Sequence, residues 1–245
     1  MSLVVTNGLS IEPKTNQQSK NTSEVYPYVI NLTNREAIYA LAEQVKREHG
    51  FVWGLINNAG ILIGKPLMET PDNKIELTIG VNVMAHFWTV KAFLQPMLDR
   101  NDGHIVGISS AAGFFPSARM VEYCTSKYAA RGFMEALRIE LSALGKSGVK
   151  TTLVAPAHIN TDLFSGYNLG GTMQPEWVAA QIVHAMQVDK AIQFLPWYIS
   201  LGNLWQGVFP TFIWDLFMLP TNSQLNNWNP TQANKIFSKM EEKKQ

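Results

Sequence analysis

The feature that most constrains this chain is the regular alternation of short apolar runs with longer helical segments. Val52–Ile56, Gly103–Ser109 and Val149–Val154 each predict a strand rich in apolar or β-branched residues. The segments at about Asn73–Arg100 and Glu122–Leu144 have the length and apolar spacing of helices. Strands that alternate with helices indicate an α/β protein whose parallel sheet is covered on both faces. Ligands bind beyond the carboxyl ends of such strands, so motifs at those positions are the most informative.

Weaker signals extend this pattern toward both ends of the chain. Val25–Ile30 predicts another strand, and Thr33 with Glu36 forms a capping-box pattern at the start of a helix. Pro175 lies where the first residue of a further helix is favoured. Ile192–Leu195 then predicts a last strand.

Composition excludes several classes of protein. The formal net charge is +1, which provides no basic stripe for nucleic acid. Cys124 is the single cysteine, so no internal disulfide can form and a reducing compartment is expected. The start lacks a basic segment followed by an apolar run, so we expect no secretory signal. His86, His104 and His158 have no companion ligands at metal-binding spacing, so we expect no metal site.

Tyr123 and Lys127 are the residues most indicative of chemistry. They lie four positions apart at the start of a predicted helix, which places the phenol and the ammonium on one face. A nearby cation lowers the pKa of a tyrosine from about 10, which makes Tyr123 a candidate general acid or base. Two polar residues accompany the pair: Ser110 follows a predicted strand, and Asn82 lies in the long helix before it.

With the Asn57-Asn58-Ala59-Gly60 turn, these residues resemble the short-chain dehydrogenase/reductases over nearly the whole chain from Leu3. The resemblance implies a Rossmann-like, doubly wound parallel sheet. It implies that Tyr123 exchanges a proton with the substrate oxygen and that Lys127 lowers the pKa of Tyr123 and binds the nicotinamide ribose. The catalytic residues that it implies are Ser110, Tyr123, Lys127 and Asn82.

The resemblance also implies a cofactor, NADP or NAD, without fixing which of the two. Ala157 replaces the glycine that usually follows Pro156, a mild departure from the family pattern. The cofactor-binding residues that it implies are Asn7, Asn31, Asn58, Ala59, Gly60, Tyr123, Lys127, Pro156, Ile159 and Thr161.

Within the family, stretches such as YCTSKYAARGFMEAL are most similar to the retinol and 17β-hydroxysteroid dehydrogenases. This similarity implies a lipophilic substrate, such as a retinoid, a steroid or another lipid. It also implies a peripheral location on the cytoplasmic face of the endoplasmic reticulum or on lipid droplets, and otherwise in the cytoplasm. The resemblance also implies a homodimer, because the apolar helix at about Asn73–Arg100 matches the family's usual dimer interface, although core packing explains most of its composition.

The opening stretch Leu3–Gly8 allows two interpretations. It is either a degenerate phosphate loop or the second strand of the fold, because no Thr-Gly-x-x-x-Gly-x-Gly motif is present. Counting forward to Asn57 favours the second strand, with the first strand and its helix missing. Asn7 then stands where NAD-preferring relatives have an acidic residue, and Asn31 stands where relatives carry an aspartate near the adenine.

The segment Ile192–Pro220 has a different character from the rest. It is rich in Trp, Phe, Leu and Ile, and it carries one charge, Asp215. No uninterrupted apolar run reaches the length of about 20 residues that a membrane span needs. We therefore divide the chain into a dinucleotide-binding domain, residues 1–191, and a C-terminal segment, residues 192–245. The latter is expected to form a lid on the core, or to contact a membrane or a lipid-like substrate.

Three functions follow as hypotheses. The first is an NAD(P)-dependent oxidoreductase that interconverts an alcohol and a carbonyl on a lipophilic substrate. The second is a truncated chain that keeps the catalytic residues, cannot bind cofactor, and is poorly stable or inactive. The third is a protein that interacts with membrane surfaces through the segment after Ile192.

Overall fold

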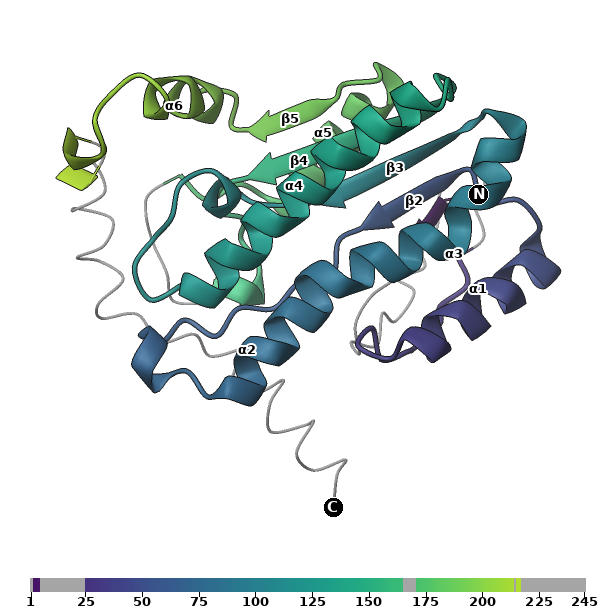
Figure 1. The fold of residues 1–245 in the computed structure, drawn as a ribbon, viewed down its shortest axis with the longest axis horizontal. Coiled ribbons are helices and arrows are strands. Elements are labelled where there is room, and N and C mark those ends of the chain that lie inside the picture. The colour runs from purple at the N-terminus through teal and green to yellow at the C-terminus, as the bar shows by residue number, and fades with distance from the viewer. Residues whose placement is uncertain (1, 5–24, 165–170, 214, 217–245) are drawn as a thin grey trace.

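The computed structural model describes residues 2–4, 25–164, 171–213 and 215–216. Its centre is a parallel sheet in which neighbouring strands follow the order of the sequence. This confirms the predicted Rossmann-like α/β class (Figure 1). The strands are β1 (Ser2–Val4), β2 (Gly54–Asn57), β3 (Gly103–Ile108), β4 (Val149–Pro156) and β5 (Ile192–Leu195).

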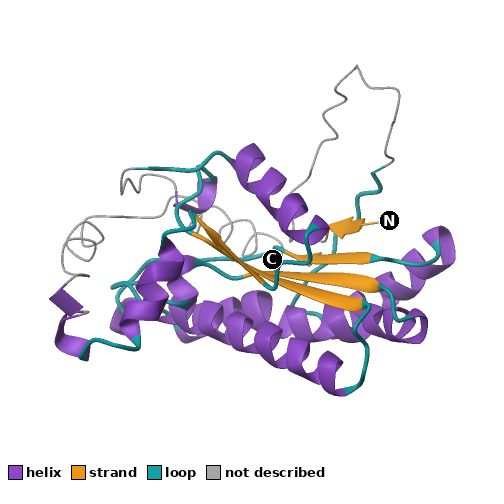
Figure 2. Ribbon diagram, turned by 90° about the horizontal axis from the view of Figure 1, so that it is seen from above, coloured by secondary structure: helices purple, strands orange, loops and turns teal. Residues whose placement is uncertain are grey.

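Helices cover both faces of this sheet (Figure 2). The segment predicted as one long helix is continuous, but a π-helical turn at Gly80–Met84 divides it into α2 and α3. The helices are α1 (Arg35–His49), α2 (Asp72–Ile79), α3 (Ala85–Arg100), α4 (Val121–Ala143), α5 (Pro175–Gln187) and α6 (Ile199–Gln206).

The alternation of side chains along the central strands produces two apolar cores. Ile105 of β3 and Leu153 of β4 point into a core that they share with α1, α3 and α4. Their sequence neighbours Val106 and Val154 point to the other face, where they pack with Val178 of α5. Successive residues of a strand face opposite sides, so continuously apolar strands need helices on both.

The start of the chain differs from the second-strand interpretation. Leu3 pairs with Leu55 and Val4 with Ile56, so β1 lies directly beside β2. In the strand order 3-2-1-4-5-6 of doubly wound sheets, the first strand is the neighbour of the fourth. Under the second-strand interpretation, β2 of this structure, which leads into the Asn-Asn-Ala-Gly turn, would be the fourth strand. The position of β1 beside β2 is therefore that of a first strand. The apolar run pairs there because the edge of β2 offers backbone groups that need partners. Asn7 lies outside the described residues.

Two local predictions near α1 were wrong. Residues 25–29 have no regular secondary structure, since Val25 and Val29 are 75% and 71% exposed and find no covered sheet face. The N-cap of α1 is Asn34 rather than Thr33: the Asn34 side chain accepts a 3.0 Å hydrogen bond from the Ala37 N–H. Glu36 pairs with Arg35 instead of completing a capping box. Asn is an N-cap residue as favourable as Asp or Ser, and more favourable than Thr.

Candidate active site

The predicted catalytic residues converge where β2, β3 and β4 end and α4 begins. Tyr123 and Lys127 lie on the first turns of α4 and are 3% and 4% exposed. Ser110 follows β3; its hydroxyl donates to the Pro156 carbonyl at 3.4 Å and hydrogen-bonds the Tyr123 side chain. Asn82 is fully buried in the π-helical turn. The structure therefore brings together four side chains that are widely separated in the sequence.

Burial controls the ionisation of Tyr123. Desolvation raises the pKa of its phenol well above 10, and the hydrogen bond with Ser110 offsets this only in part. The pKa of Tyr123 in the chain by itself therefore lies above its ordinary value, and a lowering of this pKa by Lys127 stays a prediction. The Lys127 Nζ atom lies 5.6 Å from the centroid of the Tyr123 ring and donates to the Ile108 carbonyl at 3.0 Å. A fully buried phenol loses solvation on ionising, and this loss is the largest cause of the raised pKa.

Burial also disfavours the charge on Lys127. It lowers the pKa of the Lys127 ammonium from 10.5 to about 8. The Ile108 carbonyl compensates with one hydrogen bond. A lysine of this kind can bind a hydroxyl-rich ligand through its remaining donors.

Asn82 connects the loop after β2 to the helix that carries Tyr123. Its amide accepts from the Ile61 N–H and donates to the Ile61 carbonyl, each at 2.9 Å. It also donates to the Ser126 hydroxyl, which donates to the Tyr123 carbonyl at 2.7 Å. Sequence reasoning missed Ser126, although its position three residues after Tyr123 places both on one helical face. The backbone of Gly60 faces this network, since a Cβ there would lie 3.4 Å from the Lys127 Nζ.

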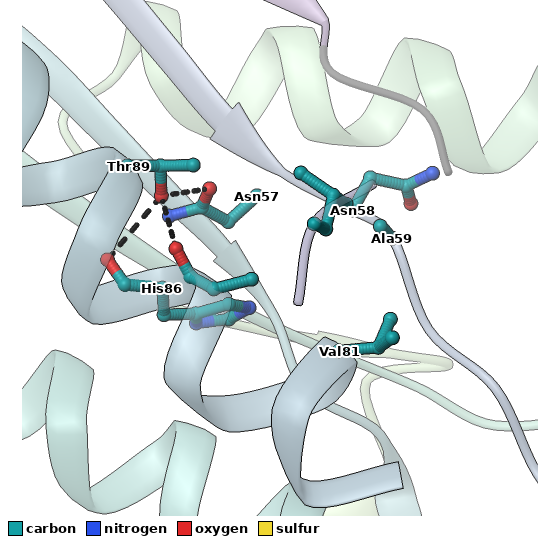
Figure 3. A pocket seen from close by; sticks show the side chains of 8 residues that line it. Asn57, Asn58, Ala59, Val81, His86 and Thr89 are labelled. Carbon is teal, nitrogen blue, oxygen red and sulfur yellow. Dashed lines mark hydrogen bonds between the residues drawn. The ribbon is translucent and has the colours of Figure 1, made fainter. Parts of the chain in front are cut away.

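A small pocket opens beside this network, below the Asn57–Ala59 turn (Figure 3). The Thr89 hydroxyl donates to the Asn57 side-chain carbonyl at 2.8 Å. The Asn57 Nδ2 and His86 Nδ1 atoms are buried and have no hydrogen-bond partner within the part of the chain that the structure describes. Burial lowers the pKa of His86 to about 3, so its ring is neutral. The lining residues are Leu32, Asn57, Asn58, Ala59, Val81, Ala85, His86 and Thr89.

Asn31 does not line this pocket. Its side chain is exposed and accepts from the Thr33 N–H at 3.0 Å and the Thr33 hydroxyl at 2.8 Å, closing a tight turn. The neighbouring Leu32 is 2% exposed and faces the pocket instead. Sequence reasoning missed Leu32, because a single apolar residue between polar ones is also common on protein surfaces and does not indicate burial.

The segment after β4 lies next to Tyr123 and makes few regular backbone hydrogen bonds with the rest of the described chain. Ile159 forms an isolated bridge with Met173, and Thr161 is exposed. Phe164 meets the Tyr123 ring edge-on, with centroids 6.2 Å apart. The apolar residues around Tyr123 are Leu62, Ala112, Met120, Cys124, Leu163 and Phe164. Leu62, Leu163 and Phe164 were not identified from the sequence, because their contacts with Tyr123 join distant parts of the chain.

Two further properties concern metals and membranes. The described residues contain no group of three His, Cys, Asp or Glu side chains that could hold a metal ion. The continuous helix Asp72–Arg100 is long and apolar enough to cross a membrane. However, 56% of its most apolar window is buried inside the protein, which is typical of a core helix.

Gly113 allows the turn after β3 to pack against α4. A Cβ at this position would lie 2.4 Å from the Ser109 hydroxyl and 2.7 Å from the Lys127 carbonyl. We expect Gly113→Ala to lower the free energy of unfolding by about 1–3 kcal/mol, because the backbone carbonyl cannot move freely. Gly132→Ala on α4 is the matched control: its Cβ meets nothing within 4 Å, so we expect it to raise stability by about 0.5–1 kcal/mol. Urea unfolding measures both; equal effects would contradict the close packing.

The fold and the site define a Rossmann-like α/β protein with a Ser, Tyr and Lys constellation at its strand ends. A family profile described as short chain dehydrogenase matches residues 4–170. The chain therefore belongs to the short-chain dehydrogenase family.

Individual relatives agree with this family. The chain is 43% identical over 190 residues to estradiol 17-beta-dehydrogenase 11 of Mus musculus, covering 77% of this chain and 64% of that protein. It is 41% identical over 194 residues to retinol dehydrogenase 10-A of Danio rerio, covering 76% and 57%. The matched region thus spans less than two thirds of either relative.

Two solved structures have the same fold. A short chain dehydrogenase/reductase from Burkholderia phymatum, in complex with NAD, superimposes with a TM-score of 0.64 at 25% identity, covering 68% of this chain and 69% of that one. A metagenomic short-chain oxidoreductase, in complex with NADP, gives a TM-score of 0.56 at 30% identity, with 68% and 70% covered.

Proposed function

We propose that this protein is an NAD(P)-dependent oxidoreductase that interconverts an alcohol and a carbonyl. The observation that carries the proposal is the convergence of buried Ser110, Tyr123 and Lys127 at the carboxyl ends of β3 and β4. An acid beside a second hydroxyl donor is suited to the charge that develops on a substrate oxygen. The named activities of the similar dehydrogenases support the same reaction class.

The residues present fit part of a dinucleotide. Lys127 and the Gly60 backbone would hold the nicotinamide ribose, and the pocket beside Asn58 and Ala59 would receive the adenosine half. The unpartnered Asn57 and His86 nitrogens at that pocket support a polar occupant. When bound, a nicotinamide supplies or accepts the hydride. The glycine-rich loop that holds the diphosphate has no counterpart in the sequence, so the fit concerns the two ends of the cofactor.

The chain's own residues would then handle the oxygen and its proton. Burial keeps the Tyr123 phenol protonated at neutral pH, the form that donates to a carbonyl oxygen. Ser110 would hydrogen-bond the same oxygen and orient it. Lys127 would hold the ribose, and Asn82 would fix the loop that closes over it. In this role Asn82 acts on Tyr123 through Ser126 and the Ile61 backbone.

We also propose that the substrate is lipophilic. Leu62, Met120 and Phe164 surround the reacting phenol with apolar surface. Such a wall favours a hydrocarbon chain or ring next to the carbonyl. The names of the relatives, which act on estradiol and retinol by their titles, support a steroid or retinoid.

A titration tests the proposal as a whole. The purified chain is mixed with NADPH or NADH, and cofactor fluorescence and thermal shift report binding. Retinal and a ketosteroid then report turnover. Binding of either cofactor with turnover of either substrate is the expected result. Absence of binding to both cofactors would favour the alternative of a catalytically inactive protein.

We propose in addition that the segment after β5 contacts a membrane surface, of the endoplasmic reticulum or a lipid droplet. Figure 1 shows α6 extending beyond the end of β5. Large apolar side chains remain exposed here, and tryptophan and tyrosine are residues that favour a lipid–water interface. The exposed set is Trp197, Tyr198, Leu201, Leu204, Val208, Phe209, Phe212 and Leu216.

Flotation with liposomes tests this contact. Wild-type protein is expected to float with neutral phosphatidylcholine vesicles, because residues 196–220 carry many apolar side chains and a single charge, Asp215. A variant with Trp197, Leu204 and Phe212 changed to serine is expected to remain in the bottom fraction of the gradient. Ile139→Ser on α4, which is 59% exposed, serves as the control and is expected to float as the wild type does. Flotation of the triple variant would contradict the proposal.

A homodimer also stays a prediction. Met84 of the π-helical turn, Phe87 of α3 and Val121 of α4 are partly exposed, which supports an interface along α3 and α4.

A further inference from the structure

Glu122 is a buried carboxyl group that the proposed reaction does not use. It immediately precedes Tyr123 on the first turn of α4 and is only 3% exposed. Its Oε1 atom accepts a 3.1 Å hydrogen bond from the Ile63 N–H. Burial raises the pKa of this carboxyl, and the backbone N–H groups of Ile63, of Glu122 and Tyr123 themselves, and of Gly64 counteract the rise. A carboxyl group buried this deeply needs such partners, and its partners all belong to backbone.

The partner of Glu122 is the loop after β2, residues 60–65, which we call the β2 loop. Glu122 holds this loop from one side. Arg119 donates from its guanidinium to the Gly64 carbonyl at 3.4 Å. Arg119 has a left-handed backbone, with φ of 60°, and Gly64 a φ of 73°. The stretch that leads into Tyr123 thus binds the Ile63 N–H and the Gly64 carbonyl, the two backbone groups on either side of the Ile63–Gly64 peptide bond.

A second attachment holds the same loop two residues earlier. Asn82 binds both backbone groups of Ile61, as described above. Leu62 lies between the two attachments, and its side chain is 1% exposed. It packs in one cluster with Met120 and Tyr123. Fixing the backbone on both sides of Leu62 therefore fixes where its side chain lies against the Tyr123 ring.

We infer that Glu122 is a positioning residue, which holds Leu62 of the β2 loop against Tyr123 and thereby shapes the lipophilic substrate site. The inference rests on the proposed function for its effect on turnover. Its structural part, the attachment of the β2 loop to Glu122, stands without that function. A residue that only begins the helix would stabilise α4 through the helix dipole and leave the loop unaffected.

The first measurement is hydrogen exchange at the Ile63 and Gly64 amides in the full chain. Glu122→Ala is expected to speed exchange at these amides by about tenfold, because buried donors lose their acceptor. Glu122→Gln keeps a carbonyl oxygen at the same place and is expected to restore most of the protection. Glu140→Ala, an exposed glutamate on the same helix, is the matched control and is expected to change neither amide.

The second measurement compares a bulky with a small substrate. Glu122→Ala is expected to lower kcat/KM for retinal about tenfold or more and for butanal much less, since only the bulky substrate contacts the wall around Leu62. Glu122→Gln is expected to recover the retinal value. If Glu122 had a merely structural role, the loss of folded protein would lower the apparent kcat/KM equally for both substrates.

The outcomes separate the inference from the proposed function. Unchanged exchange in Glu122→Ala would overturn the attachment, and faster exchange with an unchanged retinal-to-butanal ratio would overturn the positioning role. If the wild type turns over neither substrate, the proposed function fails, and exchange alone decides whether Glu122 holds the loop. Should Glu122→Ala not fold, Glu122→Asp replaces it: its carboxylate is one methylene shorter, and faster exchange at Ile63 is again expected.

Discussion

Replacing Tyr123 with phenylalanine is expected to lower kcat by about 10²–10⁴-fold, the usual contribution of a positioned general acid. The ring is retained, so its packing with Leu62, Met120 and Phe164 should persist and the fold should be intact. Only the hydroxyl that bonds Ser110 is lost. Steady-state turnover of retinal or a ketosteroid measures the effect, and cofactor fluorescence checks that binding persists.

Tyr39→Phe on α1 is the matched control, because it removes a tyrosine hydroxyl that lies outside the site. We expect its turnover to stay within about twofold of the wild type, because the half-buried Tyr39 ring, which packs against the core, is kept and only its hydroxyl is lost. Turnover by the Tyr123 variant above about a tenth of the wild-type rate would show that another group donates the proton.

The second large effect is expected at Lys127. Lys127→Met keeps the length and apolar stem of the side chain but removes the buried charge. We expect kcat/KM to fall by about 10²-fold or more, because the ribose of the cofactor loses a charged donor and the site loses the cation beside Tyr123. Cofactor binding and turnover, measured separately, show how the loss divides between the two.

The same variant should change how stability depends on pH. The pKa of Lys127 is about 8 in the folded chain and 10.5 in the unfolded chain. Between these values the unfolded chain binds more protons at this group, so the free energy of unfolding rises with pH. The rise amounts to about 3 kcal/mol, at about 1.4 kcal/mol per pKa unit.

This rise is best measured as the difference between wild type and Lys127→Met, since other groups then cancel. Tyr28, for example, has a pKa raised to about 12 through its hydrogen bond with Glu48 and titrates in both proteins. Urea unfolding at pH 7 and pH 10.5 gives the two values. A difference that does not change with pH would show that the ammonium is solvated in the folded state.

The sheet could be predicted because it follows from local pattern, and the candidate catalytic residues were assigned through the family resemblance. Continuously apolar strands such as Gly103–Ile108 are buried on both faces and require helices on each. The carboxyl ends of parallel strands meet at one edge, so Ser110 and Pro156 had to come close together. The spacing of four residues between Tyr123 and Lys127 predicted that their side chains share one face of a helix.

Other features depend on contacts that no local pattern contains. The Val25–Ile30 run has the composition of a strand, yet strand formation depends on a covered neighbour that these residues do not find. Glu122 resembles an ordinary first-turn acid until the β2 loop is seen to lie against it. The raised pKa of Tyr123 likewise could not be predicted from local sequence, because it results from burial of the phenol among distant parts of the chain.

The short strands at the two edges of the sheet affect how readily the protein would aggregate at high concentration. In the described part of the chain, the marginal strands β1 and β5 have three and four residues, against eight in β4. Short margins present few free backbone groups to a neighbouring molecule, and Pro196 directly after β5 cannot donate one. Strand addition between copies is therefore a poor route to aggregation, and any self-association should proceed through side chains instead.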